Sequence, residues 1–228
     1  MIAGIGLDLD DTLYPEPEYV RSGFAAVAAA AGASARERAE LADWLLRAFD
    51  SGVRGDTFDR MLERFPHLAD RVTVADLVQV YRRHEPAIGL SGEVAATLAR
   101  LTAAGIRLGI VTDGPVAMQA AKIRALGLEH SCSPIILTDT LGKALGKPHT
   151  AAFEAMAAQW GLRVDQLAYV GDNPRKDFAG PRRLGWVTVR LRRAGQLHVD
   201  AEPESQEFAP DVEVQGLGEL SGRLGLSV

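Results

Sequence analysis

The sequence predicts an α/β fold: a doubly wound, Rossmann-like parallel sheet with an all-α insertion. Two observations indicate it. Residues 1–9 and 105–191 alternate short apolar runs with helical patterns, whereas residues 16–88 hold helical patterns alone. Alternating strands and helices are typical of parallel sheets, because each parallel connection needs a crossover that is usually helical. We therefore expect an α/β core of residues 1–15 and 89–228 and a helical insert of residues 16–88.

The core strands are predicted from short apolar runs. The first is MIAGIG at the start of the chain, and others lie at 106–111, 134–137, 167–171 and 187–191, with a weaker one at 211–214. The main runs are apolar on both faces, which is typical of buried parallel strands. Between them, residues 116–128 and 150–162 carry apolar side chains at helical spacing with a glycine near each end.

The helical insert is predicted from apolar spacing and helix-start signals. Val20, Phe24, Val27 and Ala31 recur at three- and four-residue steps, which predicts a helix with a buried stripe. Capping-box patterns begin two more helices, Ser34 with Glu37 and Thr73 with Asp76, and residues 57–65 supply a further short helix. The insert follows the carboxyl end of the first strand, where open α/β sheets bind ligands, so we expect it to act as a lid.

Composition and charge indicate a globular protein and argue against one class of partner. The 228 residues are 47% hydrophobic and 24% charged, which is ordinary for a globular chain with a sizeable core. The formal net charge is -5 and the 25 basic residues are scattered, which argues against nucleic acid as a partner. A short basic run at 190–195 is interpreted as a solvated loop.

The cellular location is inferred from the absence of disulfide, membrane-span and signal-peptide patterns. The single cysteine, Cys132, excludes an internal disulfide framework and fits a reducing compartment. No apolar run approaches the roughly 18 residues of a membrane span, and the first residues lack the pattern of a signal peptide. We expect a cytoplasmic protein with no membrane partner, and the sequence does not predict its oligomeric state.

Chemically versatile side chains follow four of the predicted strands. They lie in DLDDT (Asp8, Asp10, Asp11), TDG (Thr112, Asp113, Gly114), GKALGKPH (Lys143, Lys147) and GDNPRKD (Asp172, Asp177). The carboxyl ends of parallel strands share one edge of a sheet, so residues far apart in sequence should converge there.

This set supports phosphoryl transfer through an aspartyl phosphate. An aspartate carboxylate can attack phosphorus and form an acyl phosphate that water then cleaves. Charge in the loose transition state spreads over three oxygens, which a lysine, a threonine hydroxyl and a magnesium ion can hold. A second aspartate two positions further on can move the protons.

The four segments resemble the motifs of the haloacid dehalogenase-like hydrolase superfamily, in particular its phosphatases with a helical C1 cap after the first motif. The quoted motifs are DLDDTLY, VTDG, GKPHTAAF and YVGDNPRKD, within residues 6–14 and 106–188. The resemblance implies that Asp8 is the nucleophile and Asp10 the general acid/base. It also implies phosphate contacts from Thr112, Asp113, Gly114 and Lys147, and a magnesium (Mg2+) site that comprises Asp8, Asp10, Asp172 and Asp177.

The implied activity is Mg2+-dependent hydrolysis of a small phosphomonoester, such as a sugar phosphate or nucleotide, so a phosphorylated metabolite is the expected partner. Two features depart from the family pattern. Asp113 stands where the second motif more often has asparagine, and Lys143 lies four residues before Lys147, although the Lys-Pro step favours Lys147.

Several alternatives stay open from the sequence. A dehalogenase of this superfamily would lack the second aspartate, and a phosphomutase would have to exclude water. A phosphonate hydrolase would need a lysine in the insert, and residues 15–92 contain none. A receiver-like or inactive phospho-binding module would share strand-end aspartates but not the insert.

Overall fold

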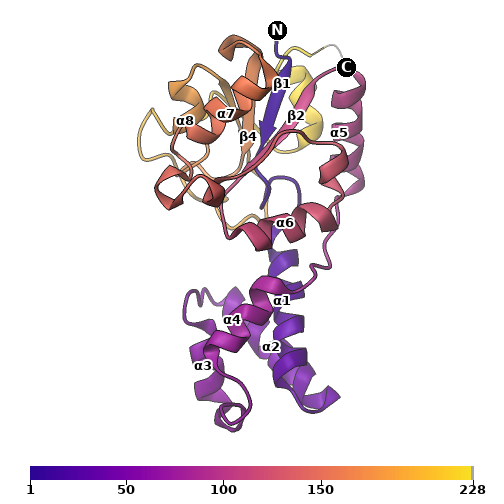
Figure 1. Cartoon of the computed structure of the whole chain (residues 1–228), viewed down its shortest axis with the longest axis vertical. Coiled ribbons are helices and arrows are strands. Elements are labelled where there is room, and N and C mark those ends of the chain that lie inside the picture. Colours follow the sequence, from indigo (N-terminus) through magenta and orange to yellow (C-terminus); the bar gives the residue numbers. More distant parts are fainter. Residues whose placement is uncertain (227–228) are drawn as a thin grey trace. The chain divides into compact units, whose positions relative to one another are not determined.

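The sheet has six strands, all parallel, in the order β3-β2-β1-β4-β5-β6 (Figure 1). The computed structural model describes residues 1–226. The strands are β1 (Gly4–Leu7), β2 (Arg107–Thr112), β3 (Ile135–Leu137), β4 (Leu167–Gly171), β5 (Val187–Leu191) and β6 (Val212–Val214). The predicted doubly wound sheet is confirmed, because the chain builds outward from β1 on one side and from β4 on the other.

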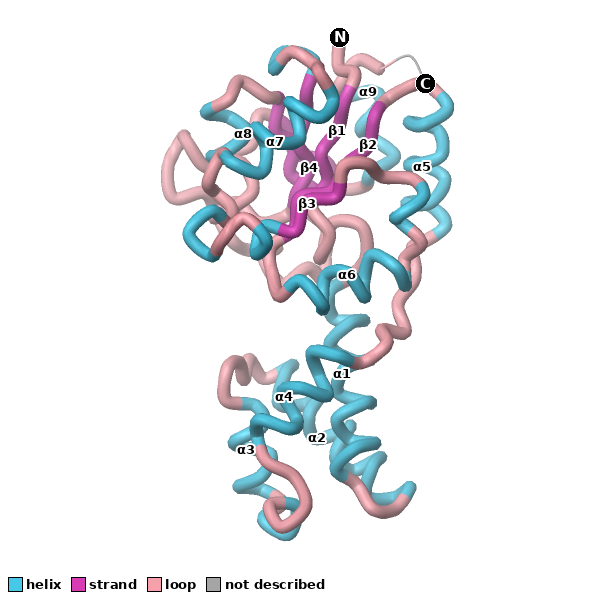
Figure 2. The backbone as a smooth tube through the Cα atoms, viewed as in Figure 1, coloured by secondary structure: helices cyan, strands magenta, loops and turns pink. Residues whose placement is uncertain are grey.

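Helices cover both faces of this sheet (Figure 2). On one side lie α7 (Ala151–Trp160) and α8 (Ala179–Arg183), and on the other α5 (Gly92–Ala103) and α9 (Leu220–Arg223). α5 is a helix that the sequence analysis did not assign. α6 (Val116–Ala125) lies beyond the carboxyl end of β1.

Glycine in β2 permits close packing of α7 on the sheet. A Cβ placed on Gly109 would lie 2.7 Å from the Met156 methyl and 2.8 Å from the Trp160 ring. Met156 and Trp160 are buried in a core cluster with Val111 and Tyr169. A larger residue at 109 would therefore push α7 off the strands.

The alignment of β1 with its neighbours positions the strand ends. Leu7 pairs with Ile110 of β2 and with Val170 of β4, so these three strands end near the same edge. β1 and β4 are the adjacent strands at which the strand order reverses, which is where open α/β sheets bind ligands.

Residues Pro17–Ile88 form a compact unit separate from the unit of Met1–Glu16 and Gly89–Val228. Its helices are α1 (Glu16–Ala31), α2 (Ala35–Asp50), α3 (Thr57–Arg64) and α4 (Val74–Arg83), which confirms that the insertion between β1 and β2 is helical. Phe24 is buried in its core, with ring centroids 6.3 Å from Phe58 and 5.7 Å from Tyr81. No helix within residues 1–226 is long and apolar enough to cross a membrane.

The two predicted capping boxes differ in the structure. Before α4, the Thr73 hydroxyl accepts from the Asp76 backbone N–H at 3.2 Å, and the Asp76 carboxylate accepts from the Thr73 backbone N–H at 2.9 Å. Before α2, Ser34 accepts from Glu37 N–H, but the Glu37 carboxylate accepts from Ala33 instead of Ser34. Only the box at Thr73 is reciprocal.

Thr73→Ala is expected to destabilise the helical insert by about 1 kcal/mol, because the first turn of α4 loses its hydroxyl acceptor. Thermal unfolding should show this as a fall in Tm of about 2–4 °C. The matched control is Thr150→Ala, since Thr150 precedes α7 without a side-chain bond to its first turn. Equal effects of the two substitutions would contradict the assignment.

Candidate active site

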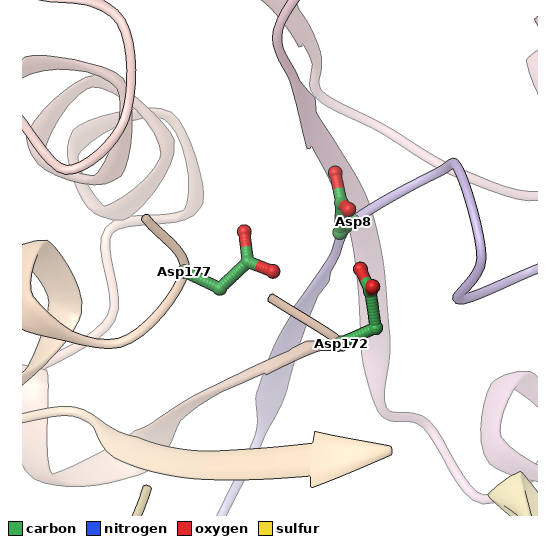
Figure 3. A group of neighbouring side chains, drawn as sticks. All are labelled: Asp8, Asp172 and Asp177. Carbon is green, nitrogen blue, oxygen red and sulfur yellow. The ribbon is translucent and has the colours of Figure 1, made fainter. Parts of the chain in front are cut away.

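Three buried carboxylates meet at the carboxyl edge of the sheet (Figure 3). Asp8 follows β1, Asp172 follows β4, and Asp177 lies in the loop after β4. Their exposed fractions are 1%, 4% and 0%, and one oxygen of each lies within 4.8 Å of the others. The structure therefore brings together three of the four predicted magnesium ligands.

Lys147 lies among these carboxylates. Its ammonium Nζ donates to Asp8 Oδ1 at 2.6 Å, to Asp177 Oδ1 at 2.7 Å and to the Tyr169 hydroxyl at 3.0 Å. Tyr169 in turn donates to the Val111 carbonyl, which fixes its hydroxyl. Lys143, the other lysine of this segment, is exposed.

The electrostatics of this group suit a bound cation. The three carboxylates, with Asp113 beside them, face the ammonium groups of Lys147 and Lys176, which leaves an excess of negative charge in a buried place. Burial, reinforced by Asp177 and Asp8, raises the pKa of Asp172 to about 9. Burial likewise raises the pKa of Asp8, although Lys147 opposes it. Asp8 Oδ2 and Asp172 Oδ2 have no hydrogen-bond partner among the described residues, so each is free to be a ligand.

Burial alone would lower the pKa of the Lys147 ammonium, but the Asp177 and Asp8 carboxylates more than offset it and raise that pKa. Burial would similarly raise the pKa of Asp177, but Lys147, Lys176 and the bond from the Asn173 backbone N–H together outweigh it and lower that pKa. In the Lys147–Asp177 ion pair each charged form stabilises the other.

Asp10 lies outside the carboxylate group and has its own partners. Lys122 Nζ donates to Asp10 Oδ1 at 2.7 Å, and Gln119 Nε2 donates to Asp10 Oδ2 at 3.0 Å. The Tyr14 hydroxyl also donates to Oδ1. Burial would raise the pKa of Asp10, but Lys122 and the hydrogen bonds from Tyr14 and Gln119 together outweigh it and lower that pKa. The structure does not bring the Asp10 side chain to the other predicted magnesium ligands.

The TDG segment ends β2 at the same edge. The Thr112 hydroxyl is buried and accepts from Gln119 Nε2 at 2.6 Å. Asp113 Oδ1 accepts from the Thr138 hydroxyl at 2.6 Å and from the Lys147 backbone N–H at 3.1 Å. As a carboxylate, Asp113 presents acceptors where an asparagine would present an N–H. Gly114 has φ +132°, which turns the chain toward α6.

Asp11 shapes the turn after the first motif. It has φ +54°, and its carboxylate accepts from the backbone N–H groups of Glu16 and Leu197 at 2.8 and 2.7 Å. Gln196 adds a bond from its side chain to the Asp11 carbonyl at 2.8 Å. Hydrogen bonds to both the carboxylate and the backbone carbonyl of Asp11 therefore fix this turn.

The interpretation of residues 190–195 as a solvated loop is wrong at its first two positions. Arg190 and Leu191 belong to β5 and are buried, and the Arg190 guanidinium donates to the Asp172 carbonyl at 3.1 Å and the His198 carbonyl at 2.9 Å. A run of arginines resembles a surface loop in sequence, but backbone carbonyls inside the fold can accept from a buried guanidinium.

Gln119 and Lys122 are site residues that the sequence analysis missed. They lie on α6, at positions i and i+3 of a buried stripe that continues with Ile123 and Leu126. Polar residues on the buried stripe of a helix were the available signal, because such side chains need partners inside the fold.

The chain matches the model of the haloacid dehalogenase-like hydrolase family over residues 2–185. It is 30% identical over 233 residues to the glyceraldehyde 3-phosphate phosphatase of Methanopyrus kandleri, with 96% of each chain covered. It is also 30% identical to the phosphoserine phosphatase of Thermus thermophilus, over 77% of this chain and 66% of that protein.

Solved structures agree in fold. The magnesium-bound putative hydrolase YfnB of Bacillus subtilis matches 99% of each chain with a TM-score of 0.65 and 21% identity. The L-2-haloacid dehalogenase of Xanthobacter autotrophicus matches with a TM-score of 0.60 and 20% identity, covering each chain fully. At these identities the likeness is one of fold. The family match, spanning most of the chain, shows that this protein belongs to the haloacid dehalogenase-like hydrolases.

Proposed function

We propose that this protein is a Mg2+-dependent phosphatase that hydrolyses a small phosphomonoester through an aspartyl phosphate on Asp8. The observation that carries the proposal is the Asp8 carboxylate: one oxygen is bonded to Lys147, and the other is buried without a partner among the described residues. A carboxylate so held has one oxygen to attack phosphorus and a neighbouring ammonium to offset the charge of the phosphate.

The reaction proceeds in two steps. Asp8 attacks phosphorus and the bond to the leaving oxygen breaks. Asp10, which is partly exposed and first takes up a proton from solvent, gives that proton to the leaving oxygen. Water then attacks the phosphorus of the aspartyl phosphate and passes a proton to Asp10, which releases inorganic phosphate and restores Asp8. Lys147 and the Thr112 hydroxyl hold the peripheral oxygens of the phosphoryl group during both steps.

The residues present fit a magnesium ion. Asp8, Asp172 and Asp177 supply the carboxylate oxygens that this ion prefers, and the unpartnered Oδ2 atom of Asp172 is available as a ligand. When bound, the ion offsets the charge of the carboxylates and of the phosphoryl oxygens. The magnesium bound to YfnB supports the same choice of metal.

Adding Mg2+ is expected to stabilise the protein, because the ion binds carboxylates that exist together only in the folded state. At 100 times its Kd the gain should be about 2.7 kcal/mol, or about 5–10 °C in Tm. Asp172→Asn should abolish most of this gain and should change the Tm of the metal-free protein little, since the raised pKa of Asp172 already keeps this carboxyl uncharged at neutral pH. An undiminished magnesium response in the variant would contradict the assignment.

The proposed substrate class is a small phosphorylated metabolite. Support comes from the relatives, whose names specify glyceraldehyde 3-phosphate, phosphoserine and, in the protein from Yersinia pestis, phosphoglycolate. The test is a panel of such phosphomonoesters with Mg2+, read out as phosphate release, with Asp8→Asn as the blank. Release from one or more members is expected. No release above the blank, from the panel or from p-nitrophenyl phosphate, would overturn the proposed function.

A further inference from the structure

Helix α6 presents two buried polar side chains to Asp10. Gln119 and Lys122 have exposed fractions of 0% and 1%, although glutamine and lysine are ordinarily surface residues. They are three positions apart on the helix, so both side chains lie on one face. Each donates to a different oxygen of the Asp10 carboxylate, Lys122 to Oδ1 at 2.7 Å and Gln119 to Oδ2 at 3.0 Å.

The Gln119 amide also reaches the second motif. Its Nε2 donates to Thr112 Oγ1 at 2.6 Å, so one amide group contacts both Asp10, the proposed proton donor, and the Thr112 hydroxyl, the proposed phosphate contact. Because the Thr112 oxygen accepts this bond, its own O–H hydrogen can be donated elsewhere.

The oxygen atom of the Gln119 amide shows that this arrangement is unfavourable for fold stability. Gln119 Oε1 is buried and has no hydrogen-bond partner among residues 1–226. Leaving a buried acceptor unsatisfied is unfavourable, so fold stability alone does not account for a glutamine here. The two bonds from Nε2 supply a reason for its presence.

The turn before α6 fixes where this amide lies. Gly114 has φ +132°, a conformation that favours glycine, and a Cβ placed on it would lie 3.3 Å from the Gln119 side chain. The carboxyl end of β2, this turn and α6 therefore hold Gln119 and Thr112 at a fixed separation.

We propose that Gln119 and Lys122 are positioning residues that hold the Asp10 carboxylate at a set place relative to Thr112, and hence to the leaving oxygen of the substrate. This inference rests on the proposed function, in which Asp10 protonates that oxygen. Buried Lys122 fixes one oxygen of the partly exposed Asp10 carboxylate through an ion pair, and Gln119 fixes the other. Misplacing a proton donor by about 1 Å can cost about 10²-fold in rate.

The test compares two phosphate esters whose leaving groups differ in how much they need protonation. p-Nitrophenolate leaves readily without one, whereas the alkoxide of an alkyl phosphate does not. Gln119→Met and Lys122→Met should each lower kcat/KM for the best alkyl phosphate of the panel by about 10–10²-fold. The value for p-nitrophenyl phosphate should fall at most a few-fold. kcat/KM is the right quantity because it reports the steps up to formation of the aspartyl phosphate.

Two controls separate this inference from the proposed function. Asp10→Asn should show the same selective loss on the alkyl phosphate, and Gln119→Met should add little to that selectivity in the Asp10→Asn background. Lys143→Met, which changes an exposed lysine, should leave kcat/KM unchanged for both substrates. If Asp10→Asn itself shows no selectivity, the proton-donor role fails and the inference fails with it.

A different outcome is that Asp10→Asn is selective, whereas the α6 variants lower kcat/KM equally for both substrates. In that case the proposed function stands and the positioning role is overturned. Circular dichroism and Tm measurements accompany each variant. Lys122→Met leaves Asp10 without its buried cation and is the variant at risk of misfolding. Gln119→Met changes no charge, so it alone decides the question if Lys122→Met does not fold.

Discussion

Asp8→Asn is expected to abolish phosphate release, with kcat reduced about 10⁴-fold or more, as for the loss of a covalent nucleophile. An amide has neither the charge nor the nucleophilicity to attack phosphorus. The substitution keeps the shape of the side chain and an oxygen that can accept from Lys147 Nζ, so the fold should survive. The measurement is phosphate release with Mg2+, together with mass spectrometry of acid-quenched enzyme for a phosphoryl group on the peptide that contains Asp8.

Asp8→Ala, which cannot revert to aspartate by deamidation, serves as the second variant. Both should lack turnover and the phosphorylated peptide, while wild type shows both. Near-normal turnover in Asp8→Ala would mean that the nucleophile lies elsewhere. A phosphorylated peptide other than the one containing Asp8 would locate it.

Lys147→Met is expected to remove both activity and stability. It leaves Asp8 and Asp177 facing each other without the ammonium that bonds both at 2.6 and 2.7 Å. Removing one partner of a buried ion pair costs about 3–5 kcal/mol, so the Tm should fall by about 6–20 °C. Loss of the phosphate contact should lower kcat by about 10²–10³-fold at a temperature at which the variant is folded.

Lys143→Met is the matched control, since it changes the neighbouring lysine of the same segment but an exposed side chain. Activity and Tm should both stay near wild type. Excess Mg2+ should restore part of the stability of Lys147→Met, because the metal replaces some of the missing positive charge. Unchanged activity in Lys147→Met, or loss of activity in Lys143→Met, would contradict the assignment.

The sheet was predictable because its signal is local. The apolar runs that became β2 and β4 are apolar on both faces, which is the pattern of strands buried between helices. The helical insert was equally readable from stripes such as Val20, Phe24 and Val27, which are buried in its core. α5 was missed, although Ser91 accepts from the Val94 backbone N–H at its start.

The candidate site was partly predictable for a related reason. Residues that follow parallel strands share an edge of the sheet, so the convergence of Asp8 and Asp172 is expected from their strand-end positions. Distinguishing Lys147 from Lys143 needed the structure, since only Lys147 is buried against the carboxylates. Two of the side-chain partners of Asp10, Gln119 and Lys122, also needed it, because they come from a helix more than 100 residues away.

The sequence by itself determined the fold class, the helical insert and the strand-end residues, because strand and helix periodicity and strand-end position are properties of short segments. Only the tertiary structure decided how the charges pair: Lys147 with Asp8 and Asp177, Lys122 with Asp10, and Arg190 with the Asp172 carbonyl. The physical reason is that a buried charge must find its partner within a few ångströms. Which partner it finds depends on how distant segments pack.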